Sequence, residues 1–356
     1  MVINVVAIGL LLLSYLAPII EPQTFWPIAF MGIAYPIFLG INLLFVLFWI
    51  FRKPSFALLS LVAILIGWKS LNKNFGFNTN KAAIERSDST TVRIMSYNVQ
   101  MFNHPTNTDV SNQREILRLI GEISPDVLCI QEFYTRSRGE NDMTQRFLEE
   151  LGLKFSSFTP AAANDYDAYG IAIFSKFPIL DSGSLGINRD EKIVNRVVYT
   201  DIERDGQIFR VYNVHLQSIG FDKEDYQYIK GDAPAGNVNV QSTRRIGQRL
   251  KWAYIKRNDQ TDLLYQHVKD VNMPYVIAGD FNDTPLSYSV NRLSQDMHNA
   301  FVEKGRGWGI TYNGAFPNFQ IDYILASKDF QITDFQIVKE KFSDHYPIWS
   351  DLRISH

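Results

Sequence analysis

Long apolar segments without a charged side chain dominate the start of the chain. Residues 2–20 and 27–51 contain no Asp, Glu, Lys or Arg, and a third, shorter apolar run lies within residues 55–69. A helix needs roughly 20 apolar residues to cross the hydrocarbon core of a bilayer. The first two runs meet this length and the third is marginal. The sequence therefore predicts a membrane anchor of about three transmembrane helices within residues 1–71. A cleaved signal peptide is a poorer interpretation of the first run, because that run has no basic leader.

Positive charges beside these runs indicate an orientation. Arg52 and Lys53 lie between the second and third runs, whereas the loop between the first two contains no Lys or Arg. The positive-inside tendency places Arg52 and Lys53 in the cytoplasm, although Lys69 and Lys73 favour the opposite arrangement. With three spans, we expect an integral protein of a bacterial-type inner membrane whose remaining residues lie outside the cytoplasm.

Composition limits the remaining possibilities. The chain has 356 residues, a formal net charge of −2 and a pI of about 6.3, which argues against binding to nucleic acid through bulk charge alone. A single cysteine, Cys129, excludes an internal disulfide framework and a cysteine-rich metal cluster. Because Cys129 lies in an apolar run, we expect a buried structural thiol.

A polar segment, residues 72–91, separates the anchor from a region of different character. It has no apolar period and is typical of a linker. Residues 92–356 alternate short apolar strands with amphipathic helices. Helices are predicted within residues 113–123 and 243–269, and strands at 92–99, 126–132, 170–175, 196–203, 207–216, 275–279, 321–326 and 347–354. Many strands, hairpins and few helices predict an α/β sandwich with two packed sheets.

Polar side chains stand at or near the ends of several of these strands. In the stretch PYVIAGDFNDTPLS, Asp280 and Asn282 follow a buried strand and project the same way, because side chains alternate along a strand. The other strands carry Asn98, Glu132, His215, Asp322, Asp344 and His345. Each residue alone is explained by a turn, a satisfied core histidine or a surface loop. Their coincidence at strand ends needs another explanation, because buried polar groups are costly unless paired.

This set of residues suits the hydrolysis of a phosphate ester. A hard cation such as Mg²⁺ takes oxygen ligands, and Glu132 is the expected main ligand. Asp280 beside Asn282 fits a base that orients and deprotonates water. His215 and Asn282, together with the metal, are expected to stabilise charge on the phosphoryl oxygens. Asp322 is the candidate that fixes the tautomer of a charged histidine at the last motif.

The same region resembles the endonuclease/exonuclease/phosphatase superfamily, Mg²⁺-dependent hydrolases that include pancreatic-type deoxyribonuclease, abasic-site endonucleases, neutral sphingomyelinases and inositol polyphosphate 5-phosphatases. The resemblance extends from residue 92 to about residue 352. It rests on seven motifs in the family's order: SYNVQMF, PDVLCIQE, YGIAIFSKFPI, VYNVHLQS, VIAGDFNDTP, IDYILAS and SDHYPI. It implies a four-layered α/β sandwich, in which two mixed sheets are flanked by helices, with Mg²⁺ or Mn²⁺ as cofactor.

Positions within the motifs carry the family's catalytic roles to this chain. His215 is similar to the histidine of the deoxyribonuclease and sphingomyelinase branches, which binds phosphate or protonates the leaving group. Asp280 is similar to the aspartate that activates water, and Asn282 to its phosphate-binding partner. Asp322 is similar to the residue that pairs with the final histidine, here His345.

The resemblance also implies a metal site and a substrate site. Asn98, Glu132 and Asp344 match the residues that hold or position the metal. Asn213, in the VYNVHLQS motif, is expected to bind substrate together with His215 and Asn282.

We therefore predict a membrane-anchored, divalent-metal-dependent phosphodiester hydrolase that acts on nucleic acid. Lipid headgroups, cleaved in the manner of a sphingomyelinase or a phosphoinositide phosphatase, are the alternative substrate, and a non-catalytic membrane scaffold is a third possibility. The polar segment 217–242 is expected to form a loop that shapes substrate choice. The basic residues of the next helix form either a solvated face or a patch for phosphate-rich partners.

Overall fold

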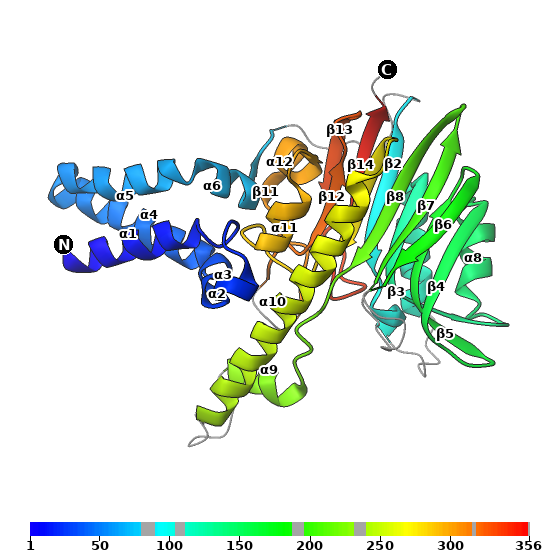
Figure 1. Cartoon of the computed structure of the whole chain (residues 1–356), viewed down its shortest axis with the longest axis horizontal. Coiled ribbons are helices and arrows are strands. Elements are labelled where there is room, and N and C mark those ends of the chain that lie inside the picture. Colours follow the sequence, from blue (N-terminus) through cyan, green and yellow to red (C-terminus); the bar gives the residue numbers. More distant parts are fainter. Residues whose placement is uncertain (80–89, 104–110, 187–195, 231–239, 315–317, 355–356) are drawn as a thin grey trace. The chain divides into compact units, whose positions relative to one another are not determined.

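A computed structural model describes residues 1–79, 90–103, 111–186, 196–230, 240–314 and 318–354 (Figure 1). The chain forms two compact units. The helical unit contains Met1–Phe75, Ile219–Asp262 and Asp283–Gln295, and the sheet unit contains Gly76–Ser218, Leu263–Asn282 and Asp296–His356. Within the predicted linker, residues 80–89 lie outside the described part, and residues 72–77 belong to a helix and a short strand.

Apolar helices make up the first part of the helical unit. Its helices are α1 (Val2–Ser14), α2 (Pro22–Phe25), α3 (Pro27–Ile33), α4 (Tyr35–Arg52), α5 (Pro54–Ile66), α6 (Trp68–Asn74), α9 (Lys223–Lys230), α10 (Val240–Lys269) as far as Asp262, and α11 (Tyr288–Leu293). Buried polar side chains join the first helices. Asn42 Nδ2 donates to the carbonyl of Ala7 at 3.0 Å, and Ser60 Oγ donates to Asn4 Oδ1 at 2.7 Å. These bonds join α1 to α4 and to α5.

The expectation of three membrane-spanning helices is wrong. Of the described helices, α4 alone is long and apolar enough to span, and the bent pair α5–α6 raises the possible number to two. The 13 residues of α1 reach only about 20 Å, shorter than a hydrocarbon core of about 30 Å. Pro18 lies shortly after α1, Pro36 lies in the first turn of α4, where proline favours a helix start, and the chain bends by 67° between α5 and α6.

Two mixed six-stranded sheets form the sheet unit and confirm the predicted α/β sandwich. The first sheet has the order β10-β12-β9-β8-β7-β6, and the second has the order β13-β14-β2-β3-β5-β4. Their strands are β2 (Val92–Asn98), β3 (Val127–Arg136), β4 (Phe155–Ala163), β5 (Asp167–Ser175), β6 (Ile179–Leu185), β7 (Val197–Arg204), β8 (Gln207–His215), β9 (Tyr275–Asp280), β10 (His298–Asn299), β12 (Asp322–Ala326), β13 (Phe330–Ile337) and β14 (Ile348–Ile354). A two-stranded sheet pairs β1 (Phe75–Phe77) with β11 (Arg306–Trp308).

Apolar side chains from both sheets meet between them, and helices pack on their outer faces, where on the first sheet His267 of α10 contacts Tyr212 of β8. Ile94 and Cys129 pack in one core with Val211 and Ala278, so Cys129 is buried as expected. On the outer face of the second sheet lie the helices α7 (Ser111–Ile123) and α8 (Met143–Glu150), which share a second core with β2 and β3. Among its described residues the unit also contains a short 3-10 helix, η1 (Gln100–Asn103), α12 (Ala300–Lys304) and the end of α10 from Leu263 onward.

Candidate active site

The central strand β9 places Asp280 between two neighbouring strands. In the parallel pair β8–β9, His215 stands opposite Asp280, and in the antiparallel pair β12–β9, Asp322 stands opposite Asp280. Gly279 has a φ of 146°, and a Cβ there would collide with the carbonyl oxygen of Val214. Only glycine fits such a close approach at a positive φ, so this residue allows β8 and β9 to carry both polar groups at one edge.

On the second sheet, a bulge directs Glu132 toward the same edge. The register between β3 and β5 shifts between Ile130 and Phe133, and Glu132 has a φ of 52°. Bulges redirect a side chain in this way and are frequent beside active sites. Asn98, at the end of β2, donates from Nδ2 to Glu132 Oε1 at 3.3 Å and to Asp280 Oδ2 at 3.2 Å. Asn98 therefore links the two sheets.

Asp280 is the centre of this group. Its Oδ1 accepts the backbone N–H of Asn282 at 2.8 Å, and its Oδ2 accepts Asn282 Nδ2 at 3.1 Å. The Nε2 atoms of His215 and His345 each lie 3.7 Å from the same Oδ2. His215 Nε2 also lies 3.9 Å from Glu132 Oε1. The structure thus brings together most of the residues singled out from the sequence.

Asp322 and His345 form a buried pair beside Asp280. His345 Nδ1 lies 3.0 Å from Asp322 Oδ2, and Thr311 Oγ1 accepts the backbone N–H of Asp322 at 3.1 Å. Burial opposes the charge on His345, but the carboxylates of Asp322 and Asp280 outweigh burial and raise the pKa of His345 to about 10. The ring is therefore a cation at neutral pH.

Burial also changes the acidity of the surrounding groups. It raises the pKa of Asp280 to about 6, although His345 opposes this change. Burial likewise raises the pKa of Glu132, and the nearby carboxylate of Asp344 adds to the rise. Burial lowers the pKa of His215 and thus favours its neutral form. The edge combines an aspartate that titrates near neutrality with one charged and one neutral histidine.

The oxygen donors at this edge fit a hard divalent cation. Glu132 is one-quarter exposed, so its carboxylate can be reached from solvent, and Asp344 is a second carboxylate close enough to affect it. A cation relieves repulsion between such like charges and prefers their oxygen atoms. Asp280, Asp322 and His345 also offer ligand atoms within 4.8 Å of one another. The positive charge of His345 makes that second group the less suitable one for a cation.

Asn213 is not brought into this group. Its side chain is fully buried, and Nδ2 donates to the carbonyls of Ile130 at 3.0 Å and Ala172 at 2.8 Å. Its Oδ1 accepts Gln131 Nε2 at 2.6 Å. These bonds join β8 to the second sheet and commit the amide to the interior, so substrate binding by Asn213 stays a prediction without support from its contacts.

Comparison with known proteins identifies the family of this chain. The pattern of the endonuclease/exonuclease/phosphatase family matches residues 95–345. The chain belongs to this family. Residues 1–74 match a separate family described as a domain of unknown function, DUF8431. No curated protein matches the chain.

Solved structures of the endonuclease/exonuclease/phosphatase family share its fold. A family protein from Beutenbergia cavernae superposes with a TM-score of 0.54 at 19% identity, covering 75% of this chain and 72% of that one. The human Nocturnin catalytic domain with a bound sulfate anion gives 0.53 at 18%, covering 76% and 96%. D. rerio TDP2 complexed with a single-stranded DNA product gives 0.51 at 16%, covering 74% and 99%. At these identities the likeness shows the fold alone.

Two tyrosines of the sheet unit were not singled out from the sequence. Burial and the nearby carboxylate of Glu132 raise the pKa of Tyr169, so its hydroxyl stays protonated close to that carboxylate. Its position directly before Gly170 in the YGIAIFS motif was the available signal. Tyr166, which is 72% exposed, lies at the turn between β4 and β5.

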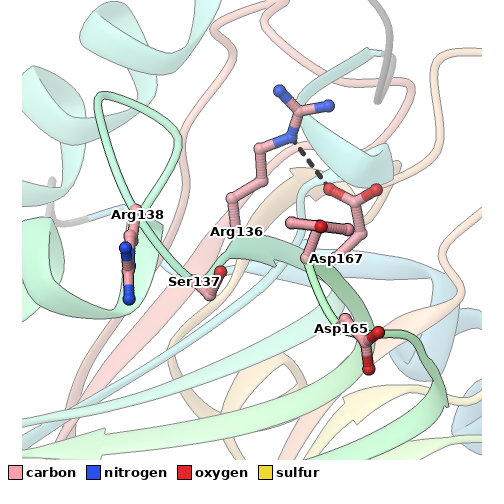
Figure 2. A pocket seen from close by; sticks show the side chains of 6 residues that line it. Arg136, Ser137, Arg138, Asp165 and Asp167 are labelled. Carbon is pink, nitrogen blue, oxygen red and sulfur yellow. Dashed lines mark hydrogen bonds and ion pairs between the residues drawn. The ribbon is translucent and has the colours of Figure 1, made fainter.

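A hollow of about 580 Å³ includes Tyr166 (Figure 2). Its lining residues are Arg136, Ser137, Arg138, Asp165, Tyr166 and Asp167. Arg136 Nε donates to Asp167 Oδ1 at 2.8 Å, while Arg138 is exposed on the loop that follows β3. The hollow therefore presents an aromatic ring, two guanidinium groups and two carboxylates, one of them paired with Arg136, at the end of the strand that carries Glu132.

The Asp322–His345 pair predicts how stability depends on pH. The folded protein raises the pKa of His345 to about 10. The contribution of the pair to the free energy of unfolding is therefore complete at pH values below about 6.5, the ordinary pKa of histidine. This stabilisation is lost as pH rises toward 10. Asp322→Asn should therefore reduce the free energy of unfolding most at pH 6 and progressively less at higher pH, as measured by denaturant titration. Parallel pH curves for both proteins would contradict the charged pair.

Proposed function

We propose that this chain is a divalent-metal-dependent phosphodiester hydrolase, held at a membrane by its N-terminal helices, that acts on nucleic acid. The observation that supports it most is the position of Asp280 within 3.7 Å of two histidines and hydrogen-bonded to two asparagines. A buried base surrounded by donors suits attack of water on phosphorus. Family membership supports hydrolysis of a phosphoester.

In this proposal, Glu132, Asn98 and Asp344 provide the metal site. Asn98 donates to Glu132 and thereby fixes its carboxylate, while Glu132 and Asp344 supply oxygen ligands. A bound Mg²⁺ or Mn²⁺ would stabilise negative charge on the phosphoryl oxygens.

The chain's own residues supply proton transfer and positioning. Asp280 accepts a proton from water, and the Asn282 N–H holds the aspartate in place. Asp322 keeps His345 charged, so the imidazolium can donate to a phosphoryl oxygen. The lowered pKa of His215 favours binding of phosphate through a neutral ring over donation of a proton to the leaving group.

The hollow around Tyr166 favours nucleic acid as substrate. Proteins that bind single strands combine exposed aromatic rings, on which bases stack, with cations that follow the backbone. Tyr166 provides an exposed ring and Arg138 an exposed cation, while Arg136 is paired with Asp167. D. rerio TDP2, which shares the fold, was captured with a single-stranded DNA product.

The apolar surface of the helical unit favours the second candidate, a phospholipid headgroup. The window of α4 has a mean hydropathy of 1.8, and only 17% of it is buried. Leu44 and Phe51 are 67% and 80% exposed. Such a surface is stable in a bilayer and would hold the enzyme close to lipid substrates.

A direct comparison of substrates separates these candidates. With Mg²⁺, we expect the full chain in detergent to cleave a single-stranded oligonucleotide faster than it releases headgroups from sphingomyelin or phosphatidylcholine vesicles. Tyr166→Ala should raise the KM for the oligonucleotide by about 5–150-fold, since stacking of a base contributes about 1–3 kcal/mol. Tyr166→Phe keeps the ring and should behave like the wild type. Headgroup release without cleavage of the oligonucleotide would favour the lipid candidate.

A further inference from the structure

Three buried polar side chains join the two sheets of the sheet unit. They belong to Ser96 on β2, Gln131 on β3 and Asn213 on β8, and each is almost completely buried. The core that the two sheets share is built from apolar side chains such as Cys129 and Val211. Polar groups are costly in such surroundings unless they are paired, so this group needs an explanation.

The group lies next to the active site along the chain. Asn213 stands two residues before His215 on β8, and both side chains therefore point to the same face of that strand. Gln131 comes directly before Glu132 on β3. The two amides thus belong to the strand segments that carry one proposed phosphate-binding residue and one proposed metal ligand.

Gln131 and Asn213 bond to each other across the space between the sheets. Gln131 Nε2 donates to Asn213 Oδ1 at 2.6 Å and to Ser96 Oγ at 3.1 Å. These bonds join β8 of the first sheet to β2 and β3 of the second.

The amide nitrogen of Asn213 reaches the place where β3 and β5 shift their register. Ile130 and Ala172 form the last regular pair before the shift, and Asn213 Nδ2 donates to both of their carbonyl oxygens, at 3.0 and 2.8 Å. A bulge interrupts the ladder of hydrogen bonds and leaves an extra residue unpaired. A donor that binds both strands at this point stabilises the interrupted arrangement.

Glu132 depends on this bulge for its direction. It has a φ of 52°, a conformation that non-glycine residues keep only where surrounding contacts fix it. Asn98 bonds to the carboxylate of Glu132 at 3.3 Å, which holds the end of the side chain. The bonds of Gln131 and Asn213 act instead on the residues that precede Glu132, and so on the backbone from which its side chain projects.

We propose that Asn213 and Gln131 are positioning residues, which hold the bulge of β3 and thereby direct Glu132 toward the metal. The bond between the two amides also fixes the strand that carries Glu132 relative to the strand that carries His215. This inference rests on the proposed hydrolase function, and it gives Asn213 a role in metal binding in place of substrate binding.

Direct measurement of metal binding tests this role without any substrate. For Asn213→Leu, we expect the Kd for Mn²⁺ to rise by about 10–100-fold, the usual effect of losing a group that orients a metal ligand. Electron paramagnetic resonance on the full chain in detergent measures this Kd. Glu132→Gln, which removes the proposed ligand itself, should weaken Mn²⁺ binding at least as much. Hydrogen exchange at residues 131–134 should accelerate in Asn213→Leu.

Steady-state kinetics then separate positioning from substrate binding. With bis(p-nitrophenyl) phosphate, Asn213→Leu should need more Mg²⁺ for half-maximal activity, whereas excess Mg²⁺ should restore kcat with little change in KM. A residue that binds substrate would instead raise KM at every Mg²⁺ concentration. Gln131→Met is the second variant if Asn213→Leu does not fold. Its effect should be in the same direction but smaller, because Asn213 Nδ2 keeps its bonds to the bulge.

Ser350→Ala is the matched control. Ser350, on β14, is fully buried, and its Oγ donates at 2.7 Å to the carbonyl of Asp334, where the pairing of β13 with β14 also shifts. This variant therefore loses a buried bond at a different bulge of the same sheet. It should lower stability without changing Mn²⁺ binding or exchange at residues 131–134.

Two results would overturn the inference. One is wild-type Mn²⁺ affinity and exchange in folded Asn213→Leu, or in Gln131→Met where the first variant does not fold. The other is a rise in KM at unchanged Mn²⁺ affinity. Absence of chelator-sensitive turnover in the wild type would instead contradict the hydrolase function, while Mn²⁺ binding and exchange would still test the positioning.

Discussion

Replacing Asp280 with asparagine should lower kcat for phosphodiester hydrolysis by about 10²–10⁴, the usual contribution of a general base. The substitution preserves the size of the side chain and keeps an oxygen that can accept the Asn282 N–H. In the wild type the Asn282 nitrogen lies 2.8 Å from Asp280 Oδ1. It removes the ability to take a proton from water. Steady-state kinetics with bis(p-nitrophenyl) phosphate measure the loss, and circular dichroism confirms that the variant is folded.

Asp201→Asn is a suitable comparison for this variant. Asp201 is also a buried aspartate of the first sheet, but its carboxylate pairs with Arg210 and belongs to no part of the proposed site. Its kcat should remain close to that of the wild type. A folded Asp280→Asn protein with wild-type kcat would exclude Asp280 as the base.

Replacing Glu132 with glutamine should raise the Mg²⁺ concentration needed for half-maximal activity by more than about 10–100-fold. Loss of a group that merely orients a ligand already costs that much, and Glu132 is proposed to bind the metal itself. Glutamine keeps the acceptor for Asn98 Nδ2 but lacks the negative charge. Activity measured over a Mg²⁺ titration gives the result.

Glu203→Gln controls for the loss of a carboxylate elsewhere. Glu203 accepts the N–H of Gly206 at the turn between β7 and β8, and glutamine can keep that bond. Its Mg²⁺ dependence should match the wild type. If Glu132→Gln also kept the wild-type dependence, the metal would have to be assigned to other residues.

The residues gathered around Asp280 could be predicted from the sequence, because the alternation of side chains along a strand depends only on neighbouring residues. The run Tyr275–Asp280 has the apolar pattern of a buried strand, and the structure contains it as β9. What local patterns do not give is register. The placement of His215 and Asp322 opposite Asp280 depends on pairing between strands far apart in the chain. The bulge that redirects Glu132 likewise depends on how β3 pairs with β5.

Apolar length alone misled the interpretation of the N-terminal runs. Proline and a bend divide them into shorter helices, which a count of apolar residues does not detect. Local sequence patterns also did not predict which segments pack together in the helical unit. The basic helix appeared to offer either a solvated face or a phosphate-binding patch, whereas Arg257 is buried against Asp283 and Arg249 lies 2.7 Å from Asp222. Such pairing joins segments separated by tens of residues.

The most direct test of a metal-dependent hydrolase is turnover of bis(p-nitrophenyl) phosphate by the full chain before and after chelation with EDTA. We predict turnover with Mg²⁺, its loss on chelation, its recovery when excess Mg²⁺ or Mn²⁺ is restored, and its near absence in Asp280→Asn. Turnover that survives chelation, or that is equal in wild type and Asp280→Asn, would contradict the proposed chemistry of this edge.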